Sequence, residues 1–146
     1  MKKLSILGLF IFALISFNSC ETEDDIVFTT QEADGFVFTN STQDNYLLSP
    51  ATSANLGERF TWMNADFGSP TNITYELQRS LIGDFTDSQV VTTTTSNEIA
   101  VTIGQMMTIA MEAGLDNTEG NNTGSFSVRL RAFPGDTGSG TEALSD

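Results

Sequence analysis

Short runs of alternating apolar and polar residues are the feature that most limits how this chain can fold. In residues 126–132, apolar side chains alternate with serine and arginine, and residues 73–78 alternate in the same way. Successive side chains of a strand point to opposite faces, so each run predicts a half-buried β-strand. Gly, Asn, Asp and Pro separate the runs, which is typical of an all-β sandwich.

We predict seven strand segments and one helix. Segments 36–38, 46–48 and 90–95 have the short or polar character of edge strands. From residue 103 the apolar spacing changes to three and four, and Gly114 follows as a stop, which predicts one short amphipathic helix near residues 104–113. The predicted strand segments are residues 36–38, 46–48, 59–63, 73–78, 90–95, 99–103 and 126–132.

The first residues have the order of an export signal. Two lysines precede an apolar stretch over residues 4–17, and an acidic tract begins directly after Cys20. As a helix, about 14 residues at about 1.5 Å each fall short of the roughly 30 Å hydrocarbon core of a bilayer. We therefore expect residues 1–19 to be a cleaved lipoprotein signal peptide.

Cys20 is the only cysteine, which excludes an intramolecular disulfide. It stands where a lipoprotein is acylated, although Phe17 and Asn18 depart from the usual leucine and small residue of a lipobox. We predict lipidation at Cys20 and anchoring to a membrane through its acyl chains. Residues 20–34 then form an acidic tether, whose first residues are either simply solvated or a sorting signal to the outer face of the outer membrane.

Removal of residues 1–19 leaves 127 of the 146 residues, enough for one domain, which we assign to residues 35–146. It also removes both lysines and leaves four arginines against 19 acidic residues, a net charge of −15. Such a chain repels phosphate, so no nucleic acid partner is expected. The chain has no histidine and no second cysteine, so we predict no enzyme activity, no cofactor and no metal site.

Loop aromatics are the residues that could stack on a sugar ring. Phe67 lies between Asp66 and Gly68 in a turn-rich segment, so it is the candidate ligand-binding residue. Trp62 is in phase with Phe60 on a predicted strand and is expected in the core.

Acidic residues offer two further alternatives, a glycosidase pair and a calcium loop. The pair would join Glu76 with Asp84 or Asp87, and calcium ligands would come from Asp66 or residues 116–121. The spacing does not bring the pair together, and the calcium ligand pattern is incomplete. We assign no catalytic residue to either.

Several segments together resemble the amino-terminal domain of SusE-type outer-membrane lipoproteins. The most specific are Phe-Thr-Trp at residues 60–62, Ala-Asp-Phe-Gly at 65–68 and Tyr-Glu-Leu-Gln at 75–78. Asn-Tyr-Leu-Leu at 45–48, Phe85 and the run 127–132 agree with it. The resemblance covers roughly the whole chain after the signal.

This resemblance implies an immunoglobulin-like antiparallel β-sandwich on the surface of the outer membrane. It implies a starch-like polysaccharide binding and uptake system, with a TonB-dependent importer and a glycan-binding lipoprotein as partners. The domain would be a non-catalytic spacer, and polysaccharide would bind to domains carboxy-terminal to it. The alternative is that this domain itself binds glycan or a partner protein, through loop aromatics or a sheet edge.

The family's sandwich also implies one more strand after residues 131–133 and their loop. Residues 143–146 show no strand pattern, so we expect the last strand to be missing and the sequence to be truncated before it. The alternative is a natural short form whose open edge is filled by a partner strand.

Overall fold

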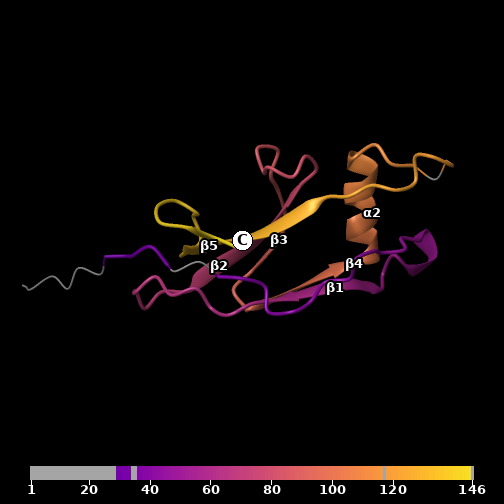
Figure 1. Ribbon diagram of the computed structural model, residues 1–146. Coiled ribbons are helices and arrows are strands. Elements are labelled where there is room, and N and C mark those ends of the chain that lie inside the picture. The colour runs from indigo at the N-terminus through magenta and orange to yellow at the C-terminus, as the bar shows by residue number, and fades with distance from the viewer. Residues whose placement is uncertain (1–28, 34–35, 117, 146) are drawn as a thin grey trace, which may run out of the picture.

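The computed structural model describes residues 29–33, 36–116 and 118–145. In these ranges the chain forms six strands, one α-helix and one short 3-10 helix (Figure 1). The elements in chain order are η1 (Pro50–Thr52), β1 (Leu56–Thr61), β2 (Ile73–Ser80), β3 (Gln89–Thr94), β4 (Glu98–Thr102), α2 (Ile103–Glu112), β5 (Ser127–Pro134) and β6 (Ala143–Leu144).

The strands form two antiparallel sheets, which confirms the predicted all-β sandwich. One sheet pairs β1 with β4, and the other has the order β3-β2-β5-β6. β2 and β5 form the centre of the larger sheet and pair over eight residues, from Ile73 opposite Pro134 to Ser80 opposite Ser127. Such long antiparallel pairing aligns the apolar residues of both strands on one face.

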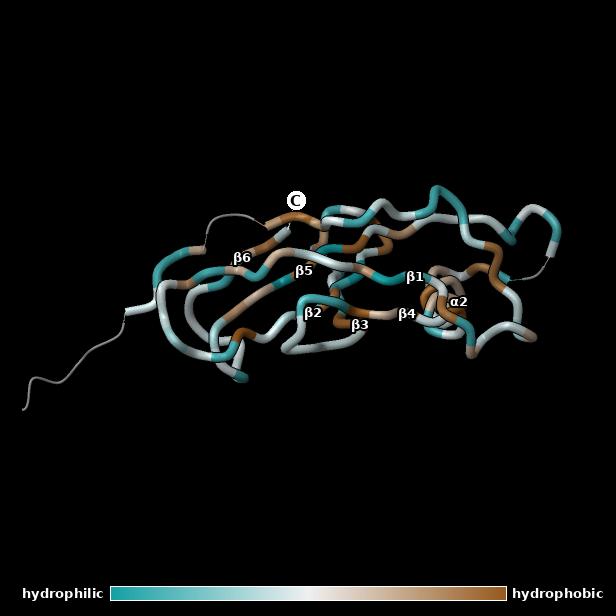
Figure 2. Tube along the Cα trace, turned by 90° about the horizontal axis from the view of Figure 1, so that it is seen from below, coloured by the Kyte–Doolittle hydropathy of each residue, from teal (hydrophilic) through white to brown (hydrophobic). Residues whose placement is uncertain are grey.

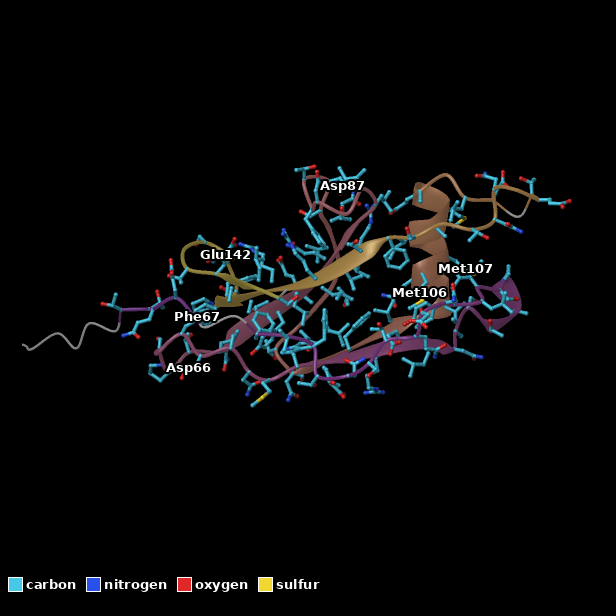
Figure 3. The ribbon with its side chains drawn as sticks, viewed as in Figure 1. Asp66, Phe67, Asp87, Met106, Met107 and Glu142 are labelled. Carbon is cyan, nitrogen blue, oxygen red and sulfur yellow. The ribbon has the colours of Figure 1, made fainter. Side chains whose placement is uncertain are left out.

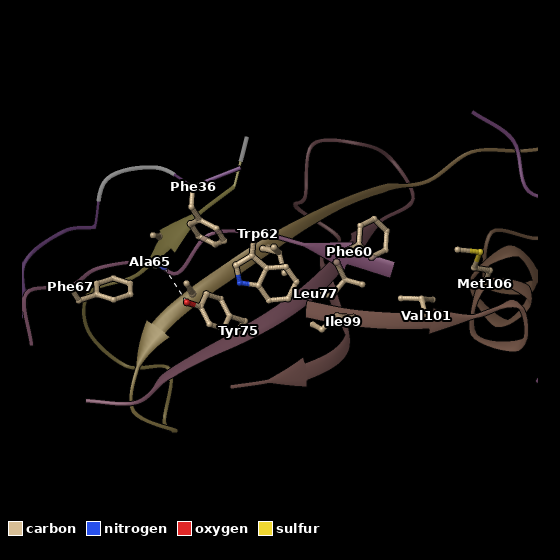
Figure 4. Close-up of a cluster of buried hydrophobic side chains, with 13 residues drawn as sticks. Phe36, Phe60, Trp62, Ala65, Phe67, Tyr75, Leu77, Ile99, Val101 and Met106 are labelled. Atoms are coloured by element: carbon tan, nitrogen blue, oxygen red, sulfur yellow. Dashed lines mark hydrogen bonds between the residues drawn. The ribbon is translucent and has the colours of Figure 1, made fainter. Parts of the chain in front are cut away.

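The core lies between the two sheets (Figure 4). β1 and β4 contribute Phe60, Ile99 and Val101, and β2 and β5 contribute residues that include Leu77 and Leu130. Along the tube of Figure 2, hydrophobic colour gathers within the strands and around α2, and hydrophilic colour covers much of the loops. Burial of alternate side chains is what selects the strand register.

Helix α2 lies at one end of the sandwich, across the ends of the strands (Figure 1). It occupies Ile103–Glu112, one residue earlier than predicted, because Thr102 and Gln105 form a capping box in which each side chain bonds the other residue's backbone N–H. Met106 and Ile109 are buried, whereas Met111 is 63% exposed. Met106 and Ile109 therefore pack the helix onto the sandwich, whereas Met107 is half-buried and Met111 faces outward.

The two predicted edge strands at residues 36–38 and 46–48 are wrong. Phe38 makes a single β-bridge with Trp62, and residues 46–48 pair with no strand. Beside β1, the Thr39 N–H donates to the Thr61 carbonyl at 2.8 Å, and Asn40 Oδ1 accepts the Thr61 N–H at 2.8 Å. The Tyr46 hydroxyl binds the side chain of Glu58. The β1 groups that a neighbouring strand would use are partly satisfied without one.

The prediction that the last strand is missing is wrong in part. Ala143 and Leu144 form β6, which pairs antiparallel with β5 opposite Ala132 and Arg131. Beyond it, the Ser145 N–H donates to the Leu130 carbonyl at 2.9 Å, and the Leu130 N–H donates to Ser145 Oγ at 2.8 Å. The pairing covers only two residues, too few for an alternating pattern to be visible in the sequence.

Candidate functional site

The residue assigned to lipidation, Cys20, lies outside the described residues, as do the signal peptide and most of the proposed tether. The described part of the proposed tether is residues 29–33. Gln31 contacts the sandwich, because its N–H donates to the Phe67 carbonyl at 2.9 Å. This bond connects the last part of the proposed tether to the loop that follows β1.

Phe67 is not the exposed platform that the sequence suggested. Its side chain is 1% exposed and belongs to the core, although Asp66 and Gly68 beside it are exposed (Figure 3). Asp66 Oδ1 accepts the Gly68 N–H at 2.8 Å, and Gly68 has a left-handed φ of 65°. This turn directs Phe67 inward, so its ring has no face available to a sugar.

Trp62 and Tyr75 lie in the core, as predicted for Trp62. They are each 2% exposed, and their ring centroids are 5.2 Å apart (Figure 4). The Tyr75 hydroxyl oxygen accepts the Ala65 N–H at 3.0 Å, which holds the loop after β1 against the larger sheet. The Trp62 indole N–H is buried without an acceptor among the described residues.

Two depressions adjoin the loop after β1, and they share Asn64 and Asp66. The first has a volume of about 500 Å³ and the second about 410 Å³. Their amides and carboxylates could bond sugar hydroxyls, but the aromatic residues that line them, Phe36 and Tyr75, are buried. Neither depression therefore has an exposed aromatic platform on which pyranose rings stack, although Val37 and Met63 are exposed in the first.

The carboxylates considered for catalysis are occupied by structural contacts. Glu76 forms an ion pair with Arg131 at 3.2 Å, while Asp87 accepts the Ser80 hydroxyl and the Leu81 N–H. The Ser80 bond, with the Leu81 bond, lowers the pKa of Asp87, which keeps it ionised as a turn acceptor. Asp84 accepts the N–H and hydroxyl of Thr86 at 2.9 and 2.8 Å.

The calcium alternative has no geometric support in the described ranges. Asp116 accepts the Thr118 N–H at 2.8 Å, and its pKa is lowered by the Thr118 hydroxyl and that backbone bond. Within residues 29–33, 36–116 and 118–145, no three His, Cys, Asp or Glu side chains come together to hold a metal ion. Asp66 and Asp116 thus serve loop conformation in this structure.

Two arginines on the outer face of the larger sheet form a network that sequence reasoning missed. Arg131 binds Glu76, Glu142 and the Gly138 carbonyl, and its guanidinium lies 4.8 Å from the centroid of the Phe133 ring. The alternation of residues 127–132 places Arg129 and Arg131 on one face, and that signal could have indicated the network.

Arg129, two residues before Arg131 on β5, also combines a side-chain hydrogen bond with a contact to an aromatic ring. Its Nε donates to Gln78 Oε1 at 2.9 Å, and its guanidinium lies 4.4 Å from the centroid of the Phe85 ring. Phe85 adopts a left-handed φ of 61°, which is unusual for a residue with a side chain. The two arginines thereby hold loops 81–88 and 135–142 over the sheet.

The comparison with known families now identifies the chain. The family model of the SusE outer membrane protein matches residues 22–131, most of the chain. The chain belongs to the SusE outer-membrane protein family. This membership confirms the family resemblance and assigns the protein to the outer membrane, in a Sus-like system. No curated protein and no solved structure matches it significantly.

The SusE family is a component of glycan-binding systems and is not a known enzyme family. None of the helices in the described ranges is both long enough and apolar enough to span a bilayer.

Proposed function

We propose that this SusE-family protein is a surface lipoprotein, anchored by acyl chains on Cys20, whose sandwich is a non-catalytic spacer in a starch-like polysaccharide binding and uptake system. In this proposal the chain consists of a signal peptide at residues 1–19, a lipidated tether at residues 20–34 and the sandwich domain at residues 35–146. Family membership supports the outer-membrane setting. The spacer role rests on the domain's own surface.

The distribution of aromatic side chains carries the proposal. Of the ten Phe, Tyr and Trp residues in the described ranges, none falls in the exposed class. Protein surfaces that bind sugars without metal ions commonly use exposed aromatic faces, because these bury the apolar face of a pyranose ring. A surface without them favours positioning over direct glycan binding, and it removes the support for binding through loop aromatics.

The mechanism of a spacer is geometric. Fifteen tether residues at about 3.5 Å each reach at most roughly 50 Å when fully extended. The strands add a rigid body, since the eight residues of β2 span about 26 Å. The surplus of acidic residues repels an anionic membrane surface, so the anchor has to come from acyl chains.

The partners of this spacer are a TonB-dependent importer and a glycan-binding lipoprotein, with polysaccharide bound by domains carboxy-terminal to residue 146. These partners follow from the family setting. The spacer would keep the binding domains at a fixed reach from the importer.

Polysaccharide retention tests the proposal. Residues 20–146 with Cys20→Ser are run in native affinity gels that contain starch, with a starch-binding protein as positive control and serum albumin as negative control. A spacer migrates at the same rate with and without starch. Clear retardation by starch contradicts the spacer role, and Asn64→Ala with Asp66→Ala then tests whether the two depressions are responsible.

A further inference from the structure

β3 has an open edge, where its strand backbone has no partner among the described residues. β3 is the terminal strand in the order β3-β2-β5-β6, so only one of its sides is paired. Its residues, Gln89–Thr94, include no charged residue and no proline, and Val90 is 49% exposed. Natural edge strands usually carry lysine, proline or another block against pairing.

The register shows which backbone groups of β3 face outward. Leu130 uses its N–H and C=O toward Ser145, so its neighbour Leu77 directs its own groups to the other side, toward Thr92. Thr93 lies next to Thr92 and therefore points its N–H and C=O away from β2. On β2, Gln78 follows Leu77 and therefore directs its backbone N–H and C=O toward β5. Its partner Val90 in β3 therefore directs its own N–H and C=O away from β2.

Other described edges differ from this one. The opposite end of the sheet is β6, which has only two residues, and on β1 the Asn40 side chain accepts the Thr61 N–H. β4 begins with Glu98, an exposed charge paired with Arg59 at 2.9 Å. β3 thus combines an accessible backbone with an uncharged, strongly β-forming sequence.

We infer that the β3 edge is a docking site for a short extended segment of a partner protein that carries basic residues at its ends and binds by β-strand addition. Backbone groups of Val90 and Thr93 would bond the added strand, and the threonine and valine side chains favour an uncharged centre. This role goes beyond that of a spacer and does not depend on it.

Charge supports basic ends for the segment. Asp87 and Glu98 flank the strand, and Glu112 lies beside Gln89 because both bind Arg79. All four arginines of the described ranges are engaged within the domain, through Glu98, Glu112, Gln78 and Glu76. Glu98 and Glu112 are thus already paired with Arg59 and Arg79, whereas Asp87 has no cationic partner among the described residues. An incoming lysine or arginine therefore meets the charge of Asp87 and the acidic excess of the domain.

A second copy of the chain fits this edge less well. Each copy after signal removal carries a net charge of −15, which opposes self-association. The register shift opposite Leu77 and Gln78 also interrupts β3 within its six residues. Bulges of this kind prevent long edge-to-edge pairing, and they limit the site to a short segment.

Peptide binding tests the inference. The probe is the fluorescent peptide Lys-Thr-Val-Thr-Val-Thr-Lys. The control peptide has the same sequence with glutamate in place of both terminal lysines. Binding to residues 20–146 with Cys20→Ser is measured by fluorescence anisotropy at low and at physiological ionic strength. We expect the lysine peptide to bind at least about tenfold more tightly than the glutamate peptide, with a difference that shrinks as salt increases.

Two pairs of variants locate the binding. Val90→Lys should weaken binding of the lysine peptide at least about tenfold, whereas Val90→Glu, which makes the same side-chain replacement with opposite charge, should preserve it. Thr93→Pro should abolish binding by removing the outward N–H, whereas Thr93→Ala should not. Circular dichroism verifies folding, and the Val90 pair decides the result if Thr93→Pro does not fold.

Hydrogen exchange provides the direct readout. We expect the peptide to slow amide exchange at Val90 and Thr93 and to leave Leu130 unchanged. Equal binding of both peptides, equal binding by the two Val90 variants, or protection confined to another edge overturns the inference. A concentration-dependent dimer that protects Val90 and Thr93 without peptide also overturns it, because the occupant is then a second copy.

Discussion

Trp62 connects the two sheets at the scale of a single residue. It follows β1, its ring is 5.2 Å from that of Tyr75 in β2, and its backbone N–H donates to the Asn97 carbonyl at 3.2 Å. One side chain thereby contacts the opposite sheet while its backbone contacts the turn before β4. Its burial assigns it to packing and not to sugar stacking.

We expect Trp62→Ala to lower the free energy of unfolding by about 3–5 kcal/mol, because it leaves a cavity between the sheets. Trp62→Phe should cost about 1–2 kcal/mol less than Trp62→Ala, because the phenyl ring fills part of that cavity, while both variants remove an indole N–H without an acceptor among the described residues. Urea denaturation followed by circular dichroism measures both. Leu47→Ala is the control, because Leu47 is 93% exposed; an equal loss there would contradict the packing argument.

Tyr46 and Glu58 couple a loop to β1 through a pH-sensitive hydrogen bond. Burial and the bond to Glu58 raise the pKa of Tyr46 to about 12. Burial opposes ionisation of Glu58, but hydrogen bonds from the Tyr46 hydroxyl and from two backbone N–H groups outweigh it and lower the pKa of Glu58. The pair is therefore formed by a neutral phenol and a charged carboxylate.

The sign of each shift defines a pH window. The Tyr46 contribution to stability is complete below its ordinary pKa of 10.0 and is lost as pH rises through about 12. The Glu58 contribution is complete above its ordinary pKa of 4.5 and is lost as pH falls through its lower folded value. We expect Tyr46→Phe to raise the pKa of Glu58, as measured by carboxyl carbon NMR titration. An unchanged Glu58 titration would show that the phenol does not stabilise the carboxylate.

At the scale of elements, β5 organises the sandwich on both of its faces. Its inner face carries Leu130 and Ala132 into the core, and its outer face carries Arg129 and Arg131. The outer network stabilises loops that have few apolar contacts of their own. β6 depends on the same network, because Arg131 lies opposite Leu144 and binds Glu142.

We expect Arg131→Lys to reduce stability by about 1–3 kcal/mol, because lysine cannot reproduce the forked bonds to two carboxylates and a carbonyl. The Ser145 amide should then exchange faster in hydrogen-exchange NMR. Arg59→Lys is the matched control, since the Arg59 and Glu98 side chains are 49% and 52% exposed, and it should change stability by less than about 0.5 kcal/mol. Unchanged exchange at Ser145 would contradict a role of Arg131 in holding β6.

The cap of α2 allows a second prediction at this scale. Thr102 Oγ1 accepts the Gln105 N–H at 3.2 Å, and Gln105 Oε1 accepts the Thr102 N–H at 2.9 Å. Thr102→Ala should cost about 1 kcal/mol, whereas Thr102→Ser should cost only a few tenths. Thermal unfolding compares them, and an equal shift in Tm for both variants would argue against the cap.

At the scale of the whole molecule, the net negative charge disfavours electrostatic binding of the protein to anionic lipid. With four arginines against 19 acidic residues, the chain after signal removal has no basic patch for anionic lipid. The lipid chain proposed on Cys20 would supply attachment to the outer membrane, the location that the family implies. Two acyl signals would suffice for stable anchoring without a spanning helix.

We expect Cys20→Ser to move the exported protein from the membrane fraction to the soluble fraction and to abolish metabolic labelling by palmitate. Ser19→Ala, which keeps a small residue before Cys20, is the control and should retain both. Membrane retention of unlabelled Cys20→Ser protein would show that another contact anchors the chain.

The sequence by itself determined the local architecture. Alternation in residues 73–78 and 126–132 predicted the central strands, and the change of period predicted α2 to within one residue. The same patterns located Trp62 in the core. These features depend on neighbours in the chain, whose periodicity follows from backbone geometry.

Only the tertiary structure decided which surfaces remain open. Phe67 is buried because its loop turns inward, where the Gln31 N–H bonds its carbonyl. Beside β1, Thr39 and Asn40 bond Thr61 without forming a strand, and residues 46–48 stay unpaired. The pairing of β6, the arginine network and the free edge of β3 likewise join residues far apart in the sequence. Such contacts follow from non-local pairing, which local periodicity does not specify.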